Sequence, residues 1–164
     1  MTRQCVAGPY TATYNGLAVG QTAEGYRLSH QFFKRVVTGD AMAQTPQDGV
    51  YQGCEMYLAM NLIEYNKAAT QSIMWPYGSS YLAHGQVGRM DVQSSLSKQI
   101  VLSAVTGTPA ADSPASITLP LCILAEGFPV ELLLAPDLRI VPLRMRVYPS
   151  DATPAADSVF GTKT

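Results

Sequence analysis

The sequence predicts a mainly β domain with one flanking α-helix. Two long segments, residues 26–37 and 51–62, alternate between their two faces with the period of two expected of a half-buried strand. Near the N-terminus, the strand-like residues 10–14 run into Asn15-Gly16, a pair suited to the φ > 0 positions of a type I′ turn, which predicts a hairpin. Only residues 63–74 repeat apolar side chains at helical spacing.

The first two strands follow from this hairpin. Its return, residues 17–19, is short, and Glu24-Gly25 predicts a second turn that leads into the strand of residues 26–37. One face of that strand is predicted to carry Tyr26, Leu28, His30 and Phe32.

A long loop is predicted over residues 38–49, because this segment has turn-forming residues and no sustained apolar period. A loop of this length within a small domain usually has a function. We expect it to reach over an adjacent subunit and to become ordered on assembly. The residues assigned to this intersubunit loop are Thr38, Gly39, Asp40, Pro46, Asp48 and Gly49.

The clearest predicted element is the strand of residues 51–62. Its core face is predicted to consist of Cys54, Met56, Leu58, Met60 and Leu62, with Gln52 on the same side. Tyr51, Tyr57 and Ala59 are expected on the opposite face, where a second layer or a neighbouring subunit would cover them.

The rest of the chain predicts further strands and a tail. The helix of residues 63–74 ends before Pro76, which cannot continue it. Residues 77–98 are expected to be a loop with one short strand at most, and three strands are predicted at residues 99–105, 117–124 and 140–148. Pro142 lacks a ladder donor and indicates an edge strand. Residues 1–149 thus form one domain, and the polar residues 150–164 are predicted to be a flexible tail.

Composition favours an assembly subunit over a DNA-binding or secreted protein. Charged residues make up 14% of the 164 residues, against roughly a quarter in typical soluble domains, so the surface is suited to lying against protein. The net charge of −1 argues against charge-driven DNA binding. Cys5, Cys54 and Cys122 are widely spaced and odd in number, which predicts free thiols and no zinc site. Neither a signal segment nor a membrane contact is expected.

No constellation for catalysis is predicted. His30 and His84 are isolated, and no glycine-rich phosphate signature is present. A pairing of Cys54 with His30 is the one enzymatic candidate, and a structural thiol is the favoured interpretation. Arg144 and Arg146 are expected to form intersubunit ion pairs, so the sequence assigns no catalytic, cofactor or metal residue.

Four segments resemble the tail-tube proteins of bacteriophages. They are GPYTATYNG at residues 8–16, VGQTAEG at 19–25, QTPQDGVYQG at 44–53 and PLRMRVYP at 142–149. The resemblance implies an antiparallel β-sandwich or barrel, and homo-hexameric rings that stack into a tube through which DNA passes without sequence specificity. It also implies a tape-measure protein, a sheath or baseplate and neck proteins as partners, in a virion tail assembled in the host cytoplasm.

Two alternatives stay open. Tube lumens in such families tend to be acidic, whereas this chain has 12 Asp and Glu residues in all, so a tube-like neck, connector or tail-terminator ring is the closest alternative. A capsid decoration protein or carbohydrate-binding module is the second, suggested by the aromatic residues Trp75, Tyr77 and Tyr81.

Overall fold

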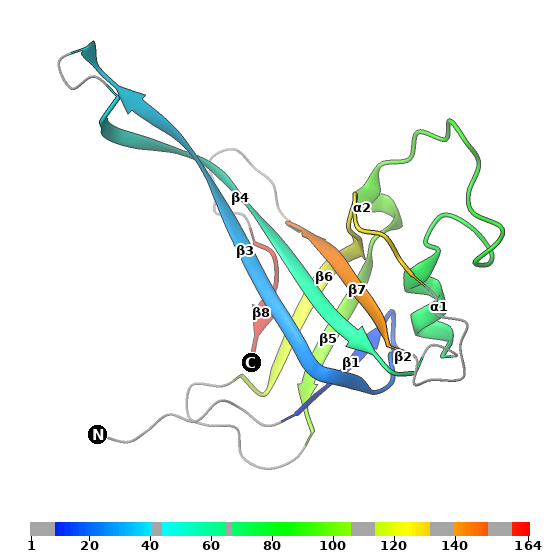
Figure 1. The fold of residues 1–164 in the computed structure, drawn as a ribbon. Helices are drawn as coiled ribbons and strands as arrows, with labels where there is room; N and C mark the ends of the chain where they lie inside the picture. The colour runs from blue at the N-terminus through cyan, green and yellow to red at the C-terminus, as the bar shows by residue number, and fades with distance from the viewer. Residues whose placement is uncertain (1–8, 41–43, 65–66, 106–113, 132–139, 151–158) are drawn as a thin grey trace, which may run out of the picture.

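The structure, a computed structural model, describes residues 9–40, 44–64, 67–105, 114–131, 140–150 and 159–164. These residues form one antiparallel sheet of eight strands and two short helices (Figure 1). The strands are β1 Tyr10–Tyr14, β2 Leu17–Ala18, β3 Thr22–Thr38, β4 Pro46–Leu62, β5 Lys98–Ala104, β6 Ser116–Leu124, β7 Val141–Tyr148 and β8 Thr162–Lys163. The helices are α1 Ala68–Met74 and α2 Gln93–Leu96. The predicted mainly β fold is confirmed, and α2 adds a short helix that the sequence did not indicate.

The sheet runs in the order β2-β1-β5-β6-β7-β4-β3, with β8 paired to β6. In Figure 1, β3, β4 and β7 lie in front of β1, β5 and β6. The sheet therefore curls back over itself, and residues of β1 and β3, from opposite ends of the strand order, line one groove.

The N-terminal hairpin is confirmed, whereas the second predicted turn is wrong. Asn15 and Gly16 have φ values of 51° and 80°, as a type I′ turn requires, and they join β1 to β2. Glu24 and Gly25 also have positive φ values, but they lie inside β3, where the pairing with β4 skips from Ala23 to Tyr26. Residues that favour φ > 0 serve a β-bulge as well as a turn, and the sequence alone did not separate the two.

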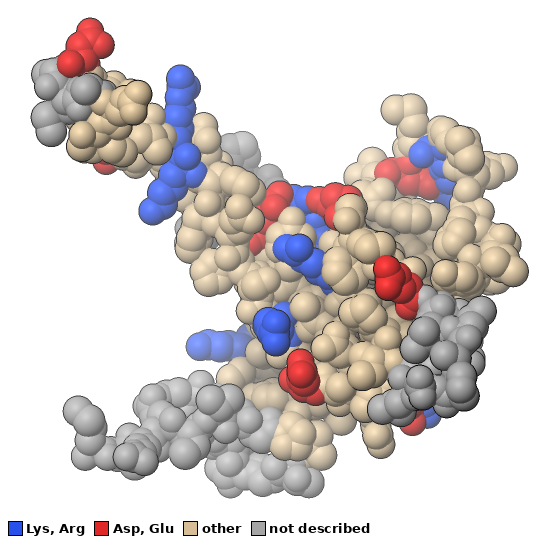
Figure 2. All heavy atoms as spheres, in the orientation of Figure 1, with Lys and Arg blue, Asp and Glu red and all other residues tan. Residues whose placement is uncertain are grey.

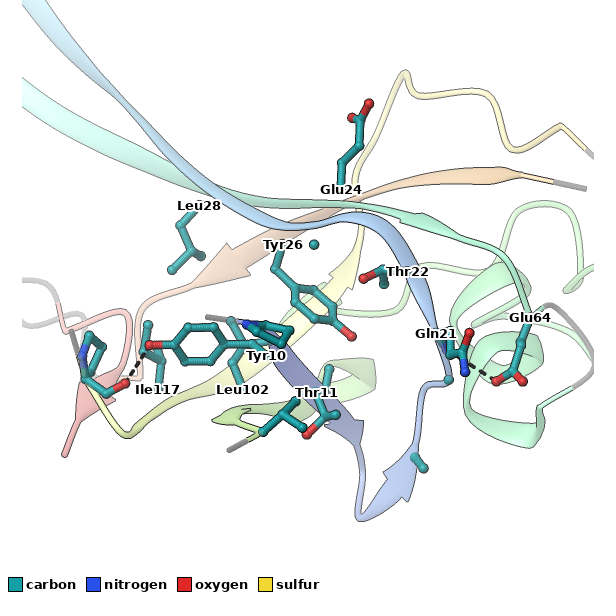
Figure 3. A pocket seen from close by; sticks show the side chains of 17 residues that line it. Tyr10, Thr11, Gln21, Thr22, Glu24, Tyr26, Leu28, Glu64, Leu102 and Ile117 are labelled. Carbon is teal, nitrogen blue, oxygen red and sulfur yellow. Dashed lines mark hydrogen bonds between the residues drawn. The ribbon is translucent and has the colours of Figure 1, made fainter. Parts of the chain in front are cut away.

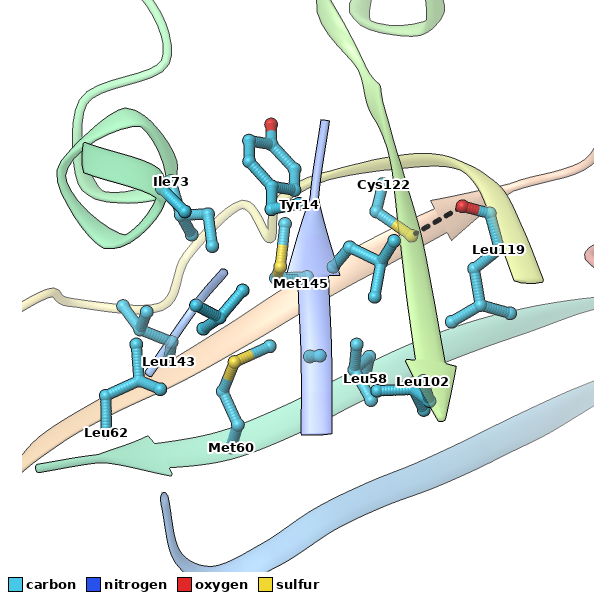
Figure 4. Packing of buried hydrophobic residues seen from close by; sticks show 14 of the residues in the cluster. Tyr14, Leu58, Met60, Leu62, Ile73, Leu102, Leu119, Cys122, Leu143 and Met145 are labelled. Atoms are coloured by element: carbon cyan, nitrogen blue, oxygen red, sulfur yellow. Dashed lines mark hydrogen bonds between the residues drawn. The ribbon is translucent and has the colours of Figure 1, made fainter. Parts of the chain in front are cut away.

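The core lies on the concave face of the sheet (Figure 4). Leu58, Met60 and Leu62 of β4 are buried, as predicted, and Met56 packs partly against them. Other core residues come from the neighbouring strands and from α1, which closes one end: Ile73, Ile100, Leu102, Leu143, Met145 and Val147. Cys54 is only half-buried, because β7 pairs with β4 no further than Met56.

Beyond Met56, where the pairing of β4 with β7 ends, β3 and β4 continue as a two-stranded hairpin that projects from the body (Figure 1). We call this hairpin, residues 31–55, the arm. Both strands are 17 residues long, and their pairing extends from Thr22 opposite Leu62 to Thr38 opposite Pro46.

The arm corrects the predicted loop of residues 38–49. Thr38 ends β3, while Pro46, Asp48 and Gly49 belong to β4. Gly39 and Asp40 lie at the tip, and residues 41–43 lie outside the described residues. An exposed two-stranded ribbon is held by its backbone ladder, so it needs no apolar period, and Pro46 is tolerated as the first residue of a strand. The role of these residues between subunits stays a prediction.

The helix and the C-terminus also differ from the prediction. α1 begins at Ala68 rather than at residue 63, because Leu62 is the last residue of β4, and it ends before Pro76 as predicted. Thr162 and Lys163 pair with β6, so this part of the tail is docked, while residues 151–158 lie outside the described residues. No helix in the described ranges is long and apolar enough to cross a membrane.

Pro142 does not mark an edge strand, since β7 lies between β6 and β4. It pairs with Asn61 of β4 at a position beyond the last pair of β7 with β6, Met145 with Leu124. The strand has a neighbour on only one side there, among the described residues, which explains why proline is accepted.

Candidate functional site

The arm exposes large apolar side chains to solvent. Phe32, Val36, Val50 and Tyr51 are each 54 to 57% exposed, and Phe33 and Val37 are exposed as well. Scattered apolar residues are ordinary on a surface, whereas a contiguous set of them usually marks an interaction site. The arm is therefore the first candidate functional surface.

A bulge in β4 determines which of these side chains share a face. Pairing passes from Phe33 opposite Gly53 to Lys34 opposite Tyr51, so that Gln52 is the extra residue. The alternation of β4 shifts by one residue here. Tyr51 consequently lies beside Phe32, with the ring centroids 6.2 Å apart, and the prediction that placed Gln52 rather than Tyr51 on that face is wrong.

The face that continues the concave side of the sheet onto the arm is called the inner face. It carries Phe32, Lys34, Val36 and Tyr51, while Phe33, Arg35, Val37 and Val50 lie on the opposite side. Lys34 and Arg35 form no ion pair with any described residue. Figure 2 shows Lys and Arg side chains in blue along the shaft of the arm.

An apolar groove of about 1030 Å³ lies where the two ends of the sheet approach each other (Figure 3). Tyr26 and Leu28 of β3 point from one wall toward Tyr10, Leu102 and Ile117 on the other. The Tyr10 hydroxyl donates a hydrogen bond of 2.6 Å to the carbonyl of Pro114, which fixes that ring in the wall.

The charged groups of the groove lie at its margin (Figure 3). Glu24 and Glu64 are its only charged lining residues in the described part of the chain. Glu64 accepts a hydrogen bond of 3.2 Å from the backbone N–H of Gln21, whereas Glu24 is exposed and has no ion-pair partner among the described residues. The groove thus combines an apolar floor with an acidic rim.

Among the described groove residues, Tyr26 carries the one buried side-chain polar group, its hydroxyl, that lacks a well-formed hydrogen bond. Burial raises the pKa of Tyr26, and the nearby Thr22 side chain and Ala12 backbone offset only part of this effect.

A polar cluster covers the convex face at the base of the arm. The Tyr57 hydroxyl donates a hydrogen bond of 2.7 Å to Glu55, and Arg146 bonds both Glu55 and Glu126. Arg144 stacks over the Tyr57 ring at 4.0 Å. Arg146 is therefore paired within the chain rather than between subunits, and Tyr57, which was expected to need a second layer, is covered by arginine.

This cluster makes a pH-dependent contribution to stability. The hydrogen bond from Tyr57, followed by the charge of Arg146, lowers the pKa of Glu55. A carboxyl whose pKa is lower in the folded state stabilises the fold above its unfolded pKa, and this contribution is lost as the pH falls through the folded pKa. Replacing Glu55→Gln is expected to destabilise the protein by less than about 1 kcal/mol at pH 7, since the group is partly exposed.

Thermal unfolding of the Glu55→Gln variant and wild type between pH 7 and pH 3 measures this contribution. The melting temperatures of the two proteins should become equal near pH 3. The matched control is Glu131→Gln, an exposed carboxyl without an ion pair to the described residues, which should show no such convergence. If the melting temperature of Glu55→Gln differed from that of wild type by the same amount at every pH, the assigned ion pair would be contradicted.

His30 and Cys54, the enzymatic candidate pair, lie on one face of the ribbon as diagonal neighbours, with His30 opposite Met56 and Cys54 opposite Phe32. The His30 ring stacks edge-on against Phe32 at 4.8 Å. Burial raises the pKa of the Cys122 thiol to about 12, so this group is a neutral core side chain near pH 7. In the described ranges, no cluster of three or more His, Cys, Asp or Glu side chains is arranged to hold a metal.

The sequence predicted the two strands at the base of the arm but assigned its outer part, residues 38–49, to a loop, and it did not indicate the groove. The groove unites Tyr26 and Leu28 of β3 with residues of β1, β5 and β6, such as Tyr10, Leu102 and Ile117; β3 lies far from these strands in the sheet order and reaches them only because the sheet curls. The rim residue Glu64 comes from a further segment. A scan against protein-family models found no family that matches this chain, and a search of curated proteins found no relative.

Proposed function

We propose that this chain is a structural subunit that oligomerises into rings, and that the rings stack into the tail tube of a phage as a conduit for DNA. The observation that carries the proposal is the arm. A two-stranded ribbon alone is marginally stable in water, and this one exposes aromatic and branched apolar side chains along its shaft. Contact with other subunits explains both its length and its composition.

The edges of the arm support assembly as well. β3 is the last strand in the sheet order, so it has an open edge, and beyond Met56 the described residues pair β4 with β3 alone. Long exposed edges are a hazard for a monomer and a means of association for a subunit.

A second exposed surface favours rings over a closed dimer. Leu82, Val87 and Met90 are more than 90% exposed in the long loop between α1 and α2. This loop and the arm project from different sides of the body (Figure 1). Several different surfaces on different sides suit heterologous contacts, in which each surface meets an unlike patch of a neighbour, and such contacts close into a ring when the rotation permits.

The tail-tube assignment within the class of ring proteins comes from the sequence resemblance. The resemblance also implies hexameric rings, an antiparallel barrel, and contacts with a tape-measure protein, with a sheath or baseplate and with neck proteins. A neck or terminator ring of the same fold remains the alternative function. A capsid decoration protein or carbohydrate-binding module is the second alternative; Tyr77 and Tyr81 are exposed, whereas Trp75 packs partly against the core.

Light scattering coupled to size exclusion, together with negative-stain microscopy of the purified protein, tests the proposal. We expect rings, and stacked rings at high concentration. A tube protein and a neck ring differ in copy number and axial position, which images of the intact particle would show. A strictly monomeric species at high concentration, without rings or tubes, would overturn the proposed function.

A further inference from the structure

We infer that the groove is the docking site for the arm of a second copy of this chain. This inference rests on the proposed function, since it names the surface that receives the arm within the assembly. The docking contact joins the inner face of the arm, with Phe32, Lys34 and Val36, to the groove between β1 and β3.

The two surfaces match in chemistry. The groove floor is apolar, with Leu28, Leu102 and Ile117 among its lining, and its volume of about 1030 Å³ admits several side chains. The inner face of the arm supplies apolar side chains, Phe32 and Val36, that are more than half exposed.

The two surfaces also match in charge. The charged residues in the groove lining are Glu24 and Glu64, both acidic. On the strands of the arm, Lys34 is the one charged residue of the inner face, because Asp48 pairs with Val37 and Glu55 with Gln31 on the opposite face. Lys34 shares the inner face with Phe32, so it would arrive at the rim together with the apolar side chains, whereas Arg35 would point away.

The arm that fills a groove has to come from another copy. β3 forms one wall of the groove and then continues outward as the arm, so the chain runs away from its own groove (Figures 1 and 3). Folding back would break the pairing of β3 with β4 that extends to Thr38. Docking of the arm onto a different copy leaves all of these β3–β4 strand pairs intact.

Charge reversal tests the pairing of Lys34 with Glu24. Each single variant, Glu24→Lys or Lys34→Glu, is expected to weaken assembly about tenfold in sedimentation velocity at low salt, and the double variant should restore it. The matched controls are Arg35→Glu combined with Glu24→Lys, which should not restore assembly, and Glu131→Lys, an exposed acid outside the groove, which should leave it unchanged. Thermal melts verify that each variant is folded.

Disulfide trapping between two differently tagged copies gives a second readout. In a Cys5→Ser, Cys54→Ser background, Thr11→Cys on one copy should cross-link to Val36→Cys on the other, while Leu82→Cys should not. Rings that persist in every charge variant, with Val36→Cys captured by Leu82→Cys, would overturn the groove assignment and leave the proposed function standing. A monomeric wild type with no cross-link would overturn both.

Discussion

Removing the arm should convert the assembly into a folded monomer. In the variant, residues 32–54 are replaced by a two-residue Asn-Gly turn that joins Gln31 to Glu55, which already face each other across the ribbon. The buried residues of β4, Leu58, Met60 and Leu62, lie outside the deletion, so the core is kept. Light scattering should then give the mass of one chain, and thermal unfolding should stay cooperative.

A shorter deletion separates the shaft of the arm from its tip. Thr38 and Pro46 also face each other, so an Asn-Gly turn between them removes only residues 39–45 and keeps Phe32, Lys34 and Val36. We expect this variant to assemble. If the variant without residues 39–45 were monomeric, the contact between subunits would lie at the tip, where Gly39 and Asp40 were predicted to bridge subunits. Rings that survive the long deletion would remove the observation on which the proposed function rests.

The sequence predicts the body of the protein better than the arm for a physical reason. Leu58, Met60 and Leu62 alternate with partly exposed residues because one face of β4 must be buried, and burial leaves a period in the sequence. Pro46 and Asp48 lie on a ribbon exposed on both sides in the described structure, where no core constrains the choice of side chain. Their turn-like composition therefore resembles a loop although the backbone is extended.

Two further features could not be predicted from the sequence: the bulge in β4 and the curling of the sheet that forms the groove. Gly53 inside a strand pattern is a known sign of a bulge, but the alternating pattern of residues 51–62 conceals the shift that places Tyr51 beside Phe32. The groove depends on how far the sheet curls, and a period of two contains no information about curvature. Both candidate surfaces consequently required the three-dimensional arrangement, while the tail-tube proposal rests on the sequence resemblance.

The core assignment predicts a large loss of stability for Leu58→Ala. Leu58 is fully buried and lies between Leu28 of β3 and Met145 of β7. Truncating it removes buried methyl groups and leaves a cavity, which typically costs about 3 kcal/mol. The armless variant is the suitable background, because unfolding of an oligomer depends on protein concentration and would mix assembly with folding.

The matched control is Leu82→Ala, the same truncation at a side chain that is 91% exposed, and it should change the free energy of unfolding by less than about 0.5 kcal/mol. Denaturant titration measures both variants. For Leu58→Ala the midpoint should fall while the slope stays constant, since the surface exposed on unfolding hardly changes. Equal effects at the two positions would mean that Leu58 does not lie in a closed core, and the concave face of the sheet would then have to be covered by another subunit.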